Sequence, residues 1–216
     1  LLSLWDPDVY SIPMLLLIGW RGEPGVHDEP QHIKQGKVQL DLLKTMDIPY
    51  TIISNEEKNV ERKIAKSVEK SIKQKRPVAI LIKKGTFDNY KSISHTSDNR
   101  FINREECLET VIKHLPIDSI VVSNTGKTSR EIFEIRERND QPHSSDFLTV
   151  GSMGHCSSIA LGIALAKPDR KVICIDGDGS LIMHMGSLST VGKLNPRNYC
   201  HILINNYAHE SVGGQP

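Results

Sequence analysis

The sequence lacks the features that mark several large classes of protein. Its 27 Lys and Arg residues nearly balance 26 Asp and Glu residues, which leaves a formal charge of +1. No global electric field is therefore available to attract nucleic acid or an anionic membrane surface. The longest apolar run, residues 14–20, is far shorter than the ~20 residues needed to cross a bilayer. We expect this run to be a strand, and we expect neither a nucleic acid nor a membrane as a partner.

The four cysteines lack the paired spacing of metal-binding motifs. In a chain of 216 residues we expect Cys107, Cys156, Cys174 and Cys200 to be buried thiols of a reducing compartment, and the protein to be cytoplasmic. The chain also begins without Met or a basic leader, and it stops at residues 213–216 without a closing helix or strand. We interpret it as an internal fragment that is truncated at both ends.

Apolar runs rich in β-formers alternate with runs of helical period, which is typical of parallel sheets covered by crossover helices. We predict an α/β fold with two doubly wound parallel-sheet domains. The intervening sequence is polar and lacks periodicity, which is typical of a linker. The predicted domains are residues 1–83 and 103–216, joined by a linker over 84–102.

The same pattern predicts the individual elements. The helix expected over 56–75 carries apolar residues on one side, so we expect that side to pack against a sheet. The residues of this side are Val60, Ile64, Ala65, Val68 and Ile72. The other expected helices cover residues 36–46, 104–115, 128–138, 155–166 and 180–192. The expected strands cover residues 14–20, 50–54, 78–83, 119–124, 171–176 and 199–205, with a short strand ending at residue 150.

One turn has a form that suits an anionic ligand. The strand over 171–176 is followed by Gly177, Asp178, Gly179 and Ser180 and then by a helix, so the turn lies where open α/β sheets bind ligands. The two glycines let the backbone approach a ligand closely, and N–H groups with the Ser180 hydroxyl can bind anionic oxygens. Such a turn is more often structural when it occurs alone, so a second feature has to decide its role.

The second feature is a strand that ends in Asn205 and Asn206, one helix and one strand later. Carboxyl ends of parallel strands lie at one sheet edge, so we expect Asn206 near Asp178. A carboxylate, an amide oxygen and a backbone carbonyl are hard ligands, which Mg²⁺ prefers together with water and phosphate oxygens. The two turns therefore predict a clamp for Mg²⁺ and a diphosphate.

Longer segments carry a resemblance to a known family. The segments are residues 19–25 (Gly-Trp-Arg-Gly-Glu-Pro-Gly), 28–32 (Asp-Glu-Pro-Gln-His), 151–155 (Gly-Ser-Met-Gly-His), 176–179 (Asp-Gly-Asp-Gly), and 209–216 (His-Glu-Ser-Val-Gly-Gly-Gln-Pro). Together they resemble the thiamine-diphosphate-dependent 2-keto-acid decarboxylases, most closely the branch that acts on phosphonopyruvate, and the resemblance covers nearly the whole chain. The branch that acts on sulfopyruvate is a close alternative.

The resemblance implies thiamine diphosphate and Mg²⁺ as cofactors, with Asp178, Asn206 and the carbonyl of Ala208 as metal ligands. It implies that Met153 supports the bent cofactor. An isolated Met is more often core filler, and this alternative stays open. The implied cofactor-binding residues are Thr125, Gly151, Ser152, Met153, Gly177, Asp178, Gly179, Ser180 and Asn206.

The implied reaction is decarboxylation of 3-phosphonopyruvate to phosphonoacetaldehyde and CO₂ through a thiamine diphosphate ylide, in 2-aminoethylphosphonate biosynthesis. The substrate class is a 2-keto acid with a distal phosphonate, and the implied assembly is a homo-oligomer, a dimer or larger. Lys127, Arg130, His155 and His209 are candidates to bind the substrate. The segment with Lys127 and Arg130 can also be a capping turn with a solvated helix face. A sulfopyruvate decarboxylase and a catalytically inactive binding fragment are the alternatives.

The sequence departs from the family pattern in two places. Tyr207 replaces a small residue after Asn206, and its side chain crowds the metal loop unless it points to solvent. The glutamate that activates the cofactor in this family lies upstream of the residues present, so no catalytic residue is identified. We reject Glu23 for this role because its loop matches a different stretch of the family. We expect the chain alone to be inactive as a decarboxylase.

Overall fold

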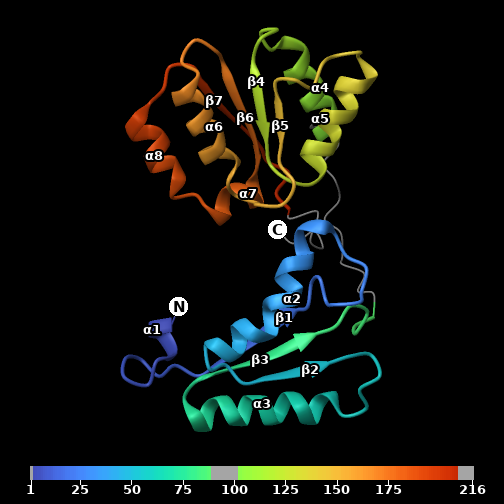
Figure 1. Ribbon diagram of the computed structural model, residues 1–216, viewed down its shortest axis with the longest axis vertical. Coiled ribbons are helices and arrows are strands. Elements are labelled where there is room, and N and C mark those ends of the chain that lie inside the picture. The colour runs from blue at the N-terminus through green and yellow to red at the C-terminus, as the bar shows by residue number, and fades with distance from the viewer. Residues whose placement is uncertain (1, 89–101, 209–216) are drawn as a thin grey trace. The chain divides into compact units, whose positions relative to one another are not determined.

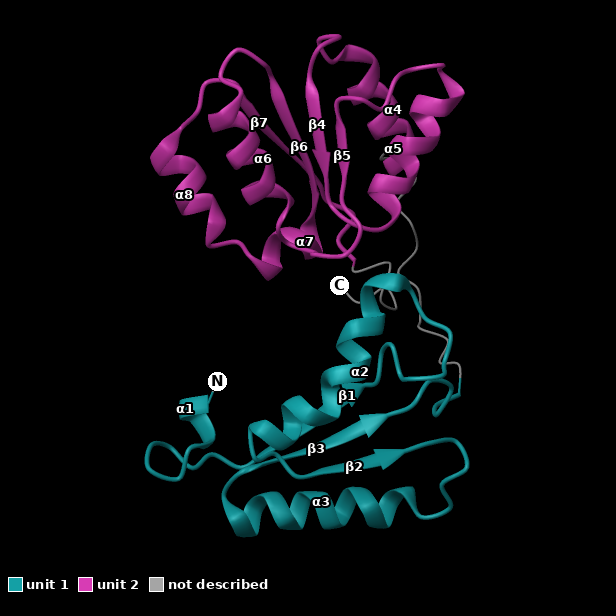
Figure 2. Ribbon diagram, in the orientation of Figure 1, with its two compact units in different colours: residues 1–91 teal, residues 92–216 magenta. Residues whose placement is uncertain are grey.

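The computed structural model describes residues 2–88 and 102–208. Figure 1 labels its helices and strands, and Figure 2 colours its two compact units, residues 1–91 and residues 92–216. The division between the units falls within 84–102, the segment predicted as a linker. In the described part of the chain, every helix is too short or too polar to cross a membrane.

Unit 1 contains a sheet of three parallel strands in the order β1-β3-β2. Strand β3 lies in the middle because its residues are almost all apolar and can be buried on both faces. Helices α2 and α3 lie on opposite faces of the sheet (Figure 1). The elements are α1 (Leu2–Trp5), β1 (Met14–Gly19), α2 (Pro30–Thr45), β2 (Tyr50–Ile53), α3 (Val60–Gln74) and β3 (Pro77–Ile82).

Helix α2 begins six residues before the predicted start at Gly36. Pro30 occupies its first turn, where a missing N–H costs nothing. Gly36 lies inside the helix, at a position where the loop passes close to it. Only glycine fits there without a collision, since an added Cβ would lie 1.8 Å from the carbonyl oxygen of Gly22. Gly36, which we predicted as the first residue of the helix, is therefore the point where helix and loop lie in close contact.

Helix α3 packs against the sheet through only part of the side predicted from its apolar residues, since Val60 and Ile64 are half-buried. Ser67 and Ser71 are buried beneath it, whereas Val68 is 38% exposed and Ile72 is 62% exposed. The hydroxyl of Ser71 lies 3.0 Å from the carbonyl oxygen of Met14 on β1, which joins the helix to the sheet. The prediction for Val68 and Ile72 was wrong because small side chains allow the helix backbone to approach the strands.

Unit 2 contains four parallel strands in the order β5-β4-β6-β7. The order places β4, β6 and β7 side by side, although they are separated along the chain. The elements are α4 (Arg104–His114), β4 (Ile120–Ser123), α5 (Lys127–Arg138), β5 (Asp146–Leu148), α6 (Cys156–Ala166), β6 (Val172–Gly177), α7 (Asp178–Met183), α8 (Ser187–Leu194) and β7 (Tyr199–Ile204).

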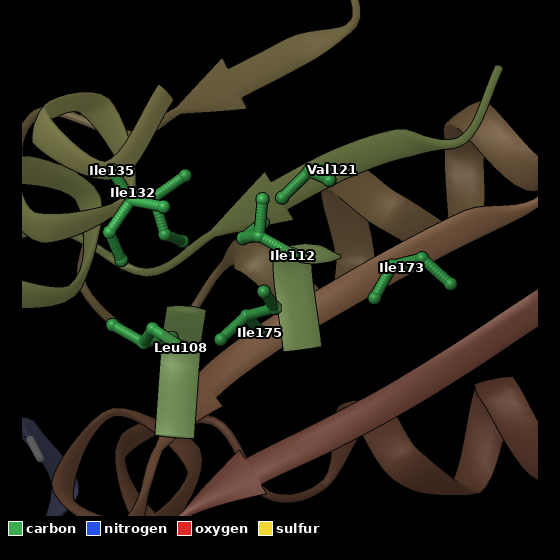
Figure 3. Packing of buried hydrophobic residues seen from close by; sticks show 7 residues of the cluster. All are labelled: Leu108, Ile112, Val121, Ile132, Ile135, Ile173 and Ile175. Atoms are coloured by element: carbon green, nitrogen blue, oxygen red, sulfur yellow. The ribbon is translucent and has the colours of Figure 1, made fainter. Parts of the chain in front are cut away.

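Alternating residues of β4 and β6 build two cores on opposite faces of this sheet. Figure 3 shows the first core, between the sheet and helices α4 and α5; it contains Leu108, Ile112, Val121, Ile132, Ile135, Ile173 and Ile175. The second core lies under α6 and contains Val122, Cys156, Ala160, Ala164, Val172 and Cys174. Helices cover both faces of each parallel sheet, so the predicted α/β fold with two doubly wound sheets is confirmed.

The helix predicted over 180–192 is broken in two. Helix α7 ends at Met183 and α8 begins at Ser187. Between them the ring of His184 packs over Gly154, whose added Cβ would lie 2.7 Å from the ring, and contacts the His155 ring at 4.2 Å between centroids. With this packing, the chain turns across the start of α6 instead of continuing along one helix axis.

A candidate cofactor site at the carboxyl edge of unit 2

Three loops meet at the carboxyl edge of the unit 2 sheet, after β4, β6 and β7. They surround one open cavity within this unit, together with residues from α4 and from the loop that precedes α6. Its lining consists of Arg104, Asn124, Thr125, Lys127, Thr128, Met153, Gly177, Asp178, Gly179, Ser180, Ile204, Asn206 and Ala208. The strand order therefore gathers residues from five separate parts of the sequence around one space.

The three predicted metal ligands lie together at this cavity. One carboxylate oxygen of Asp178, Oδ2, accepts a hydrogen bond of 3.1 Å from the backbone N–H of Asn206, and the other accepts one of 2.7 Å from Gly179. The side-chain oxygen of Asn206 accepts a bond of 3.2 Å from the N–H of Ala208. The turns after β6 and β7 are thus joined directly, as the spacing in the sequence indicated.

Asn124 is a site residue that the sequence reasoning did not select. It is 7% exposed, lines the cavity, and directly follows β4 as Asp178 follows β6. Its side-chain oxygen has no hydrogen-bond partner among the described residues. Its side-chain nitrogen would lie 3.0 Å from a Cβ added to Gly177. A buried acceptor without a donor is uncommon in folded proteins, so this atom indicates a place for a ligand.

The loop over 149–155 is tied to both neighbouring turns. The N–H of Gly151 donates to the hydroxyl of Thr125 at 2.8 Å, and the N–H of Gly154 donates to the hydroxyl of Ser180 at 3.1 Å. Gly154 has a φ of +88° and no room for a Cβ, so glycine is required there. Ser152 also has a positive φ, of 49°. Met153 lines the cavity from this tightly held loop.

Of the four substrate candidates, only Lys127 lines the described part of the cavity. Arg130 lies one turn further along α5 and is exposed. His155 is exposed at the start of α6, where its Nδ1 lies 3.2 Å from the carbonyl oxygen of Ser152 and its ring faces a neighbouring depression beside His184. His209 lies outside the described residues.

Arg104 is a second residue that the sequence reasoning did not select. Its guanidinium lines the cavity and is held by Glu131 through two hydrogen bonds, Nε to Oε2 at 2.7 Å and Nη2 to Oε1 at 2.6 Å. Arg104 and Glu131 come from different helices and are distant in sequence, so no local motif predicts the pair. A bidentate pair of this kind holds the guanidinium in a defined orientation.

Tyr207 does not crowd the metal loop. Its backbone has a φ of 57°, and the residue is 75% exposed. Its N–H donates to the side chain of Asn205 at 2.9 Å. The left-handed conformation turns the bulky ring outward, which removes the difficulty that the sequence raised.

In unit 1 the motif over 21–32 forms a network centred on Asp28. Arg21 donates to both oxygens of Asp28, at 2.9 and 2.6 Å, and Nδ1 of His32 lies 2.9 Å from Oδ1. The Arg21 guanidinium holds the pKa of the Asp28 carboxyl well below its usual range, with His32 adding to the effect. Glu23 forms an ion pair of 2.6 Å with Lys83. The role of this motif in the described structure is to hold the loop.

The ligand atoms and charged groups at the unit 2 cavity fit Mg²⁺ and a diphosphate. A carboxylate, a side-chain amide and a backbone carbonyl are hard oxygen ligands, and the buried Asn124 oxygen adds an acceptor that lacks a donor. Lys127 and Arg104 supply positive charge at the same cavity. The chemistry of the residues is therefore that of a site for a metal-bound anion.

Comparison with known proteins agrees with this geometry. Residues 122–216 match the family described as thiamine pyrophosphate enzyme, C-terminal TPP binding domain. A phosphonopyruvate decarboxylase from Streptomyces viridochromogenes is 33% identical over 220 residues, covering 94% of this chain and 54% of that protein. The sulfopyruvate decarboxylase subunit beta of Methanocaldococcus jannaschii is 43% identical over 112 residues, covering 52% of this chain and 56% of that protein.

A sulfopyruvate decarboxylase from Methanosarcina acetivorans is 31% identical over 229 residues, covering 95% of this chain and 56% of that protein. The chain thus spans about half the length of these relatives. Residues 122–216 of this chain are therefore similar to the C-terminal TPP-binding domain of the thiamine pyrophosphate enzymes, and thiamine diphosphate with Mg²⁺ is the cofactor that the cavity fits.

Proposed function

We propose that this chain takes part in the decarboxylation of a 2-keto acid with thiamine diphosphate and Mg²⁺, and that the substrate is 3-phosphonopyruvate. The products are phosphonoacetaldehyde and CO₂. The observation that carries the proposal is the direct contact between Asp178 and the Asn206 turn, at a cavity that also contains the buried Asn124 oxygen. The named relatives support the type of reaction.

Each cavity residue has a distinct part in this proposal. Asp178, the side-chain oxygen of Asn206 and the carbonyl of Ala208 hold Mg²⁺, while N–H groups of the turns after β4 and β6 bind phosphate oxygens. Met153 supports the cofactor from a loop that two hydrogen bonds hold in place. When bound, thiamine diphosphate supplies the electron sink that makes loss of CO₂ possible.

The substrate's distal anion requires cationic partners near the cavity. Lys127 lines the cavity and is the first candidate. Arg104 adds a positively charged group whose orientation is set by Glu131. Arg130, His155 and His209 remain predictions for the same role. We place the phosphonate on the side of the cavity formed by α4 and the start of α5.

Sulfopyruvate is the second candidate substrate. The aligned 112 residues of the sulfopyruvate decarboxylase beta subunit from Methanocaldococcus jannaschii are 43% identical, a higher value than for the phosphonopyruvate decarboxylase over its longer alignment. Sulfonate and phosphonate share three oxygens and a similar shape, so a cationic pocket serves either.

We further propose that the chain works in an oligomer; relatives named as beta subunits come from proteins with more than one kind of subunit.

The test of the proposed site compares two aspartates that flank β6. Asp178 follows the strand at the cavity, whereas Asp169 precedes it, is exposed and lies at a different depression. In isothermal titration calorimetry with thiamine diphosphate and Mg²⁺, we expect Asp178→Ala to weaken binding by about 100-fold or more, since changes outside the ligand shell already cost 10–100-fold. Asp169→Ala should leave the affinity unchanged.

Unchanged affinity in Asp178→Ala, with circular dichroism showing a folded protein, would remove the site from the proposal. Release of CO₂ from 3-phosphonopyruvate is then measured on the complete protein in which the chain occurs. Cofactor binding without CO₂ release from any 2-keto acid would favour the catalytically inactive binding fragment.

A further inference from the structure

A second group of ligand-type side chains lies beside the cofactor cavity, on the face of the sheet that α6 covers. Cys174 and Asp176 are two residues apart on β6, so both point toward this face. Cys174 pairs in register with His201 on β7, whose side chain lies on the same face. Cys156 is the first residue of α6, which packs on that face. Three elements therefore bring four potential metal ligands together.

The group is compact and buried. The sulfur atoms of Cys156 and Cys174 and a carboxylate oxygen of Asp176 all lie within 4.8 Å of one another. These three residues are at most 1% exposed. Nε2 of His201 lies 3.4 Å from Oδ2 of Asp176, and the His201 side chain is 17% exposed. Donor atoms of three side chains thus form one buried group, which His201 adjoins through Asp176.

The polar atoms that face this region lack ordinary hydrogen bonds. One oxygen of Asp176, Oδ1, accepts the N–H of Gly177 at 2.9 Å. The other oxygen, Oδ2, and Nε2 of His201 are buried and face each other as an ion pair of 3.4 Å, and neither makes a hydrogen bond of normal geometry within residues 2–88 and 102–208. Buried polar atoms are almost always bonded, and a buried carboxylate is costly unless it is paired or binds a metal.

We propose that Cys156, Cys174, Asp176 and His201 form a binding site for Zn²⁺, separate from the Mg²⁺ site at Asp178. Thiolate and imidazole ligands select zinc, whereas Mg²⁺ prefers oxygen. In tetrahedral zinc sites with Zn–S of about 2.3 Å and Zn–O of about 2.0 Å, ligand atoms lie roughly 3.5 Å apart. The three grouped atoms lie within 4.8 Å of one another, so they and the His201 ring have to draw together to reach that geometry.

Zinc binding at this group also changes its protons. Cys156 and Cys174 bind as thiolates and His201 as the neutral imidazole, so the protons that these three side chains carry before binding are released to solvent. The ion then links α6, β6 and β7 at the point where β6 leads into Gly177 and Asp178. Its role is structural: it holds the strand end from which the cofactor turn begins.

The test uses Co²⁺ as a spectroscopic probe on the full chain after removal of metals with a chelator. Tetrahedral Co²⁺ with thiolate ligands shows sulfur-to-metal charge-transfer absorption, which Mg²⁺-type oxygen sites cannot give. We expect this absorption to saturate at one equivalent of Co²⁺ and to disappear when one equivalent of Zn²⁺ is added. The variants Cys156→Ser and Cys174→Ser should each lose at least half of the charge-transfer intensity.

Two further cysteines provide matched controls. Cys107 is partly buried on α4 and Cys200 is exposed on β7, next to His201 but on the other face. Cys107→Ser and Cys200→Ser should keep the full absorption, and Asp178→Ala should keep it as well, which separates this site from the cofactor site. His201→Gln should weaken Co²⁺ binding by about tenfold or more.

Absence of charge-transfer absorption in the folded wild-type chain would overturn the proposal. An unchanged spectrum in folded Cys156→Ser and Cys174→Ser would do the same, because the ion would then bind elsewhere. Circular dichroism shows whether a serine variant is folded. If it is not, the wild-type chain is purified with Zn²⁺ and its metal content is measured after gel filtration. One zinc per chain supports the site, and no zinc contradicts it.

Discussion

At the scale of single residues, Asp28 has the strongest electrostatic surroundings in unit 1. Its carboxylate accepts from Arg21, from the N–H groups of Gly22 and Glu29, and contacts His32. These partners all favour the charged form, which is why the pKa of Asp28 lies well below its usual range. The same bonds hold the loop that packs against Gly36, so protonation and loop stability are linked.

We predict that Asp28→Asn lowers the stability of unit 1 at pH 7. Because the folded-state pKa is depressed, the stabilisation is present above the unfolded pKa, near 4, and is lost as pH falls toward the folded value. The difference between wild type and variant should therefore shrink below about pH 4. Urea unfolding followed by tryptophan fluorescence measures it, since Trp5 and Trp20 are the two tryptophans of the chain and both lie in unit 1.

Asp41 serves as the control for this experiment. It is exposed on α2, with only a contact of 3.4 Å to Lys44. Exposed pairs of this kind contribute little, so Asp41→Asn should change the unfolding free energy by less than about 0.5 kcal/mol. A difference for Asp28→Asn that grows as pH falls would contradict the role assigned to the network.

At the scale of elements, α3 shows how a helix can bury its small polar residues instead of its apolar ones. Ser67 and Ser71 face the sheet, and the hydroxyl of Ser71 lies near the carbonyl oxygens of both Met14 and Arg76. Larger side chains at these positions would push the helix away from β1 and β3. The close approach, rather than apolar area, therefore sets the position of α3.

We predict that Ser71→Ala costs unit 1 about 1 kcal/mol, because a buried acceptor loses its donor. Ile72→Gln should change the stability by less than about 0.5 kcal/mol, since that side chain is 62% exposed. Urea unfolding followed by tryptophan fluorescence compares the two variants. The opposite order would mean that the apolar side of the helix contributes more to packing than the serine side.

At the scale of the whole molecule, the proposed function makes a prediction about substrate choice. We expect kcat/KM to decrease from 3-phosphonopyruvate to sulfopyruvate to pyruvate in the complete enzyme. The phosphonate carries a second negative charge, and one additional charge-assisted hydrogen bond of roughly 1.5 to 3 kcal/mol gives about tenfold or more. Pyruvate has no distal anion, so it gains none of these charge-assisted hydrogen bonds.

The measurement compares the three substrates at one pH in wild type and in Lys127→Ala. Loss of the Lys127 ammonium group should reduce the preference for 3-phosphonopyruvate over pyruvate by about tenfold. Sulfopyruvate in first place would assign the protein to the alternative reaction. Pyruvate in first place would contradict an anion pocket at this site.

The α/β class, the parallel sheets and the meeting of Asp178 with Asn206 could all be predicted from the order of residues. This was possible because these features depend on short-range patterns: alternation of strands and helices, and the rule that parallel strands end at one sheet edge. The resemblance also identified the cofactor family. The start of α2 and the break between α7 and α8 were mispredicted, since close packing at Gly36 and Gly154 decided them.

Which distant side chains meet depends on the packing of the whole domain and could not be predicted from the order of residues. Asn124 and Arg104 reach the cavity because β4 lies beside β6 and α4 packs on α5, which no local pattern announces. The cysteines have no metal-binding spacing in the sequence, yet strand register places Cys174 opposite His201 and beneath Cys156. Spacing along the chain does not reveal such groups, because a fold brings ligands together through strand order and helix packing. These are properties of the whole domain.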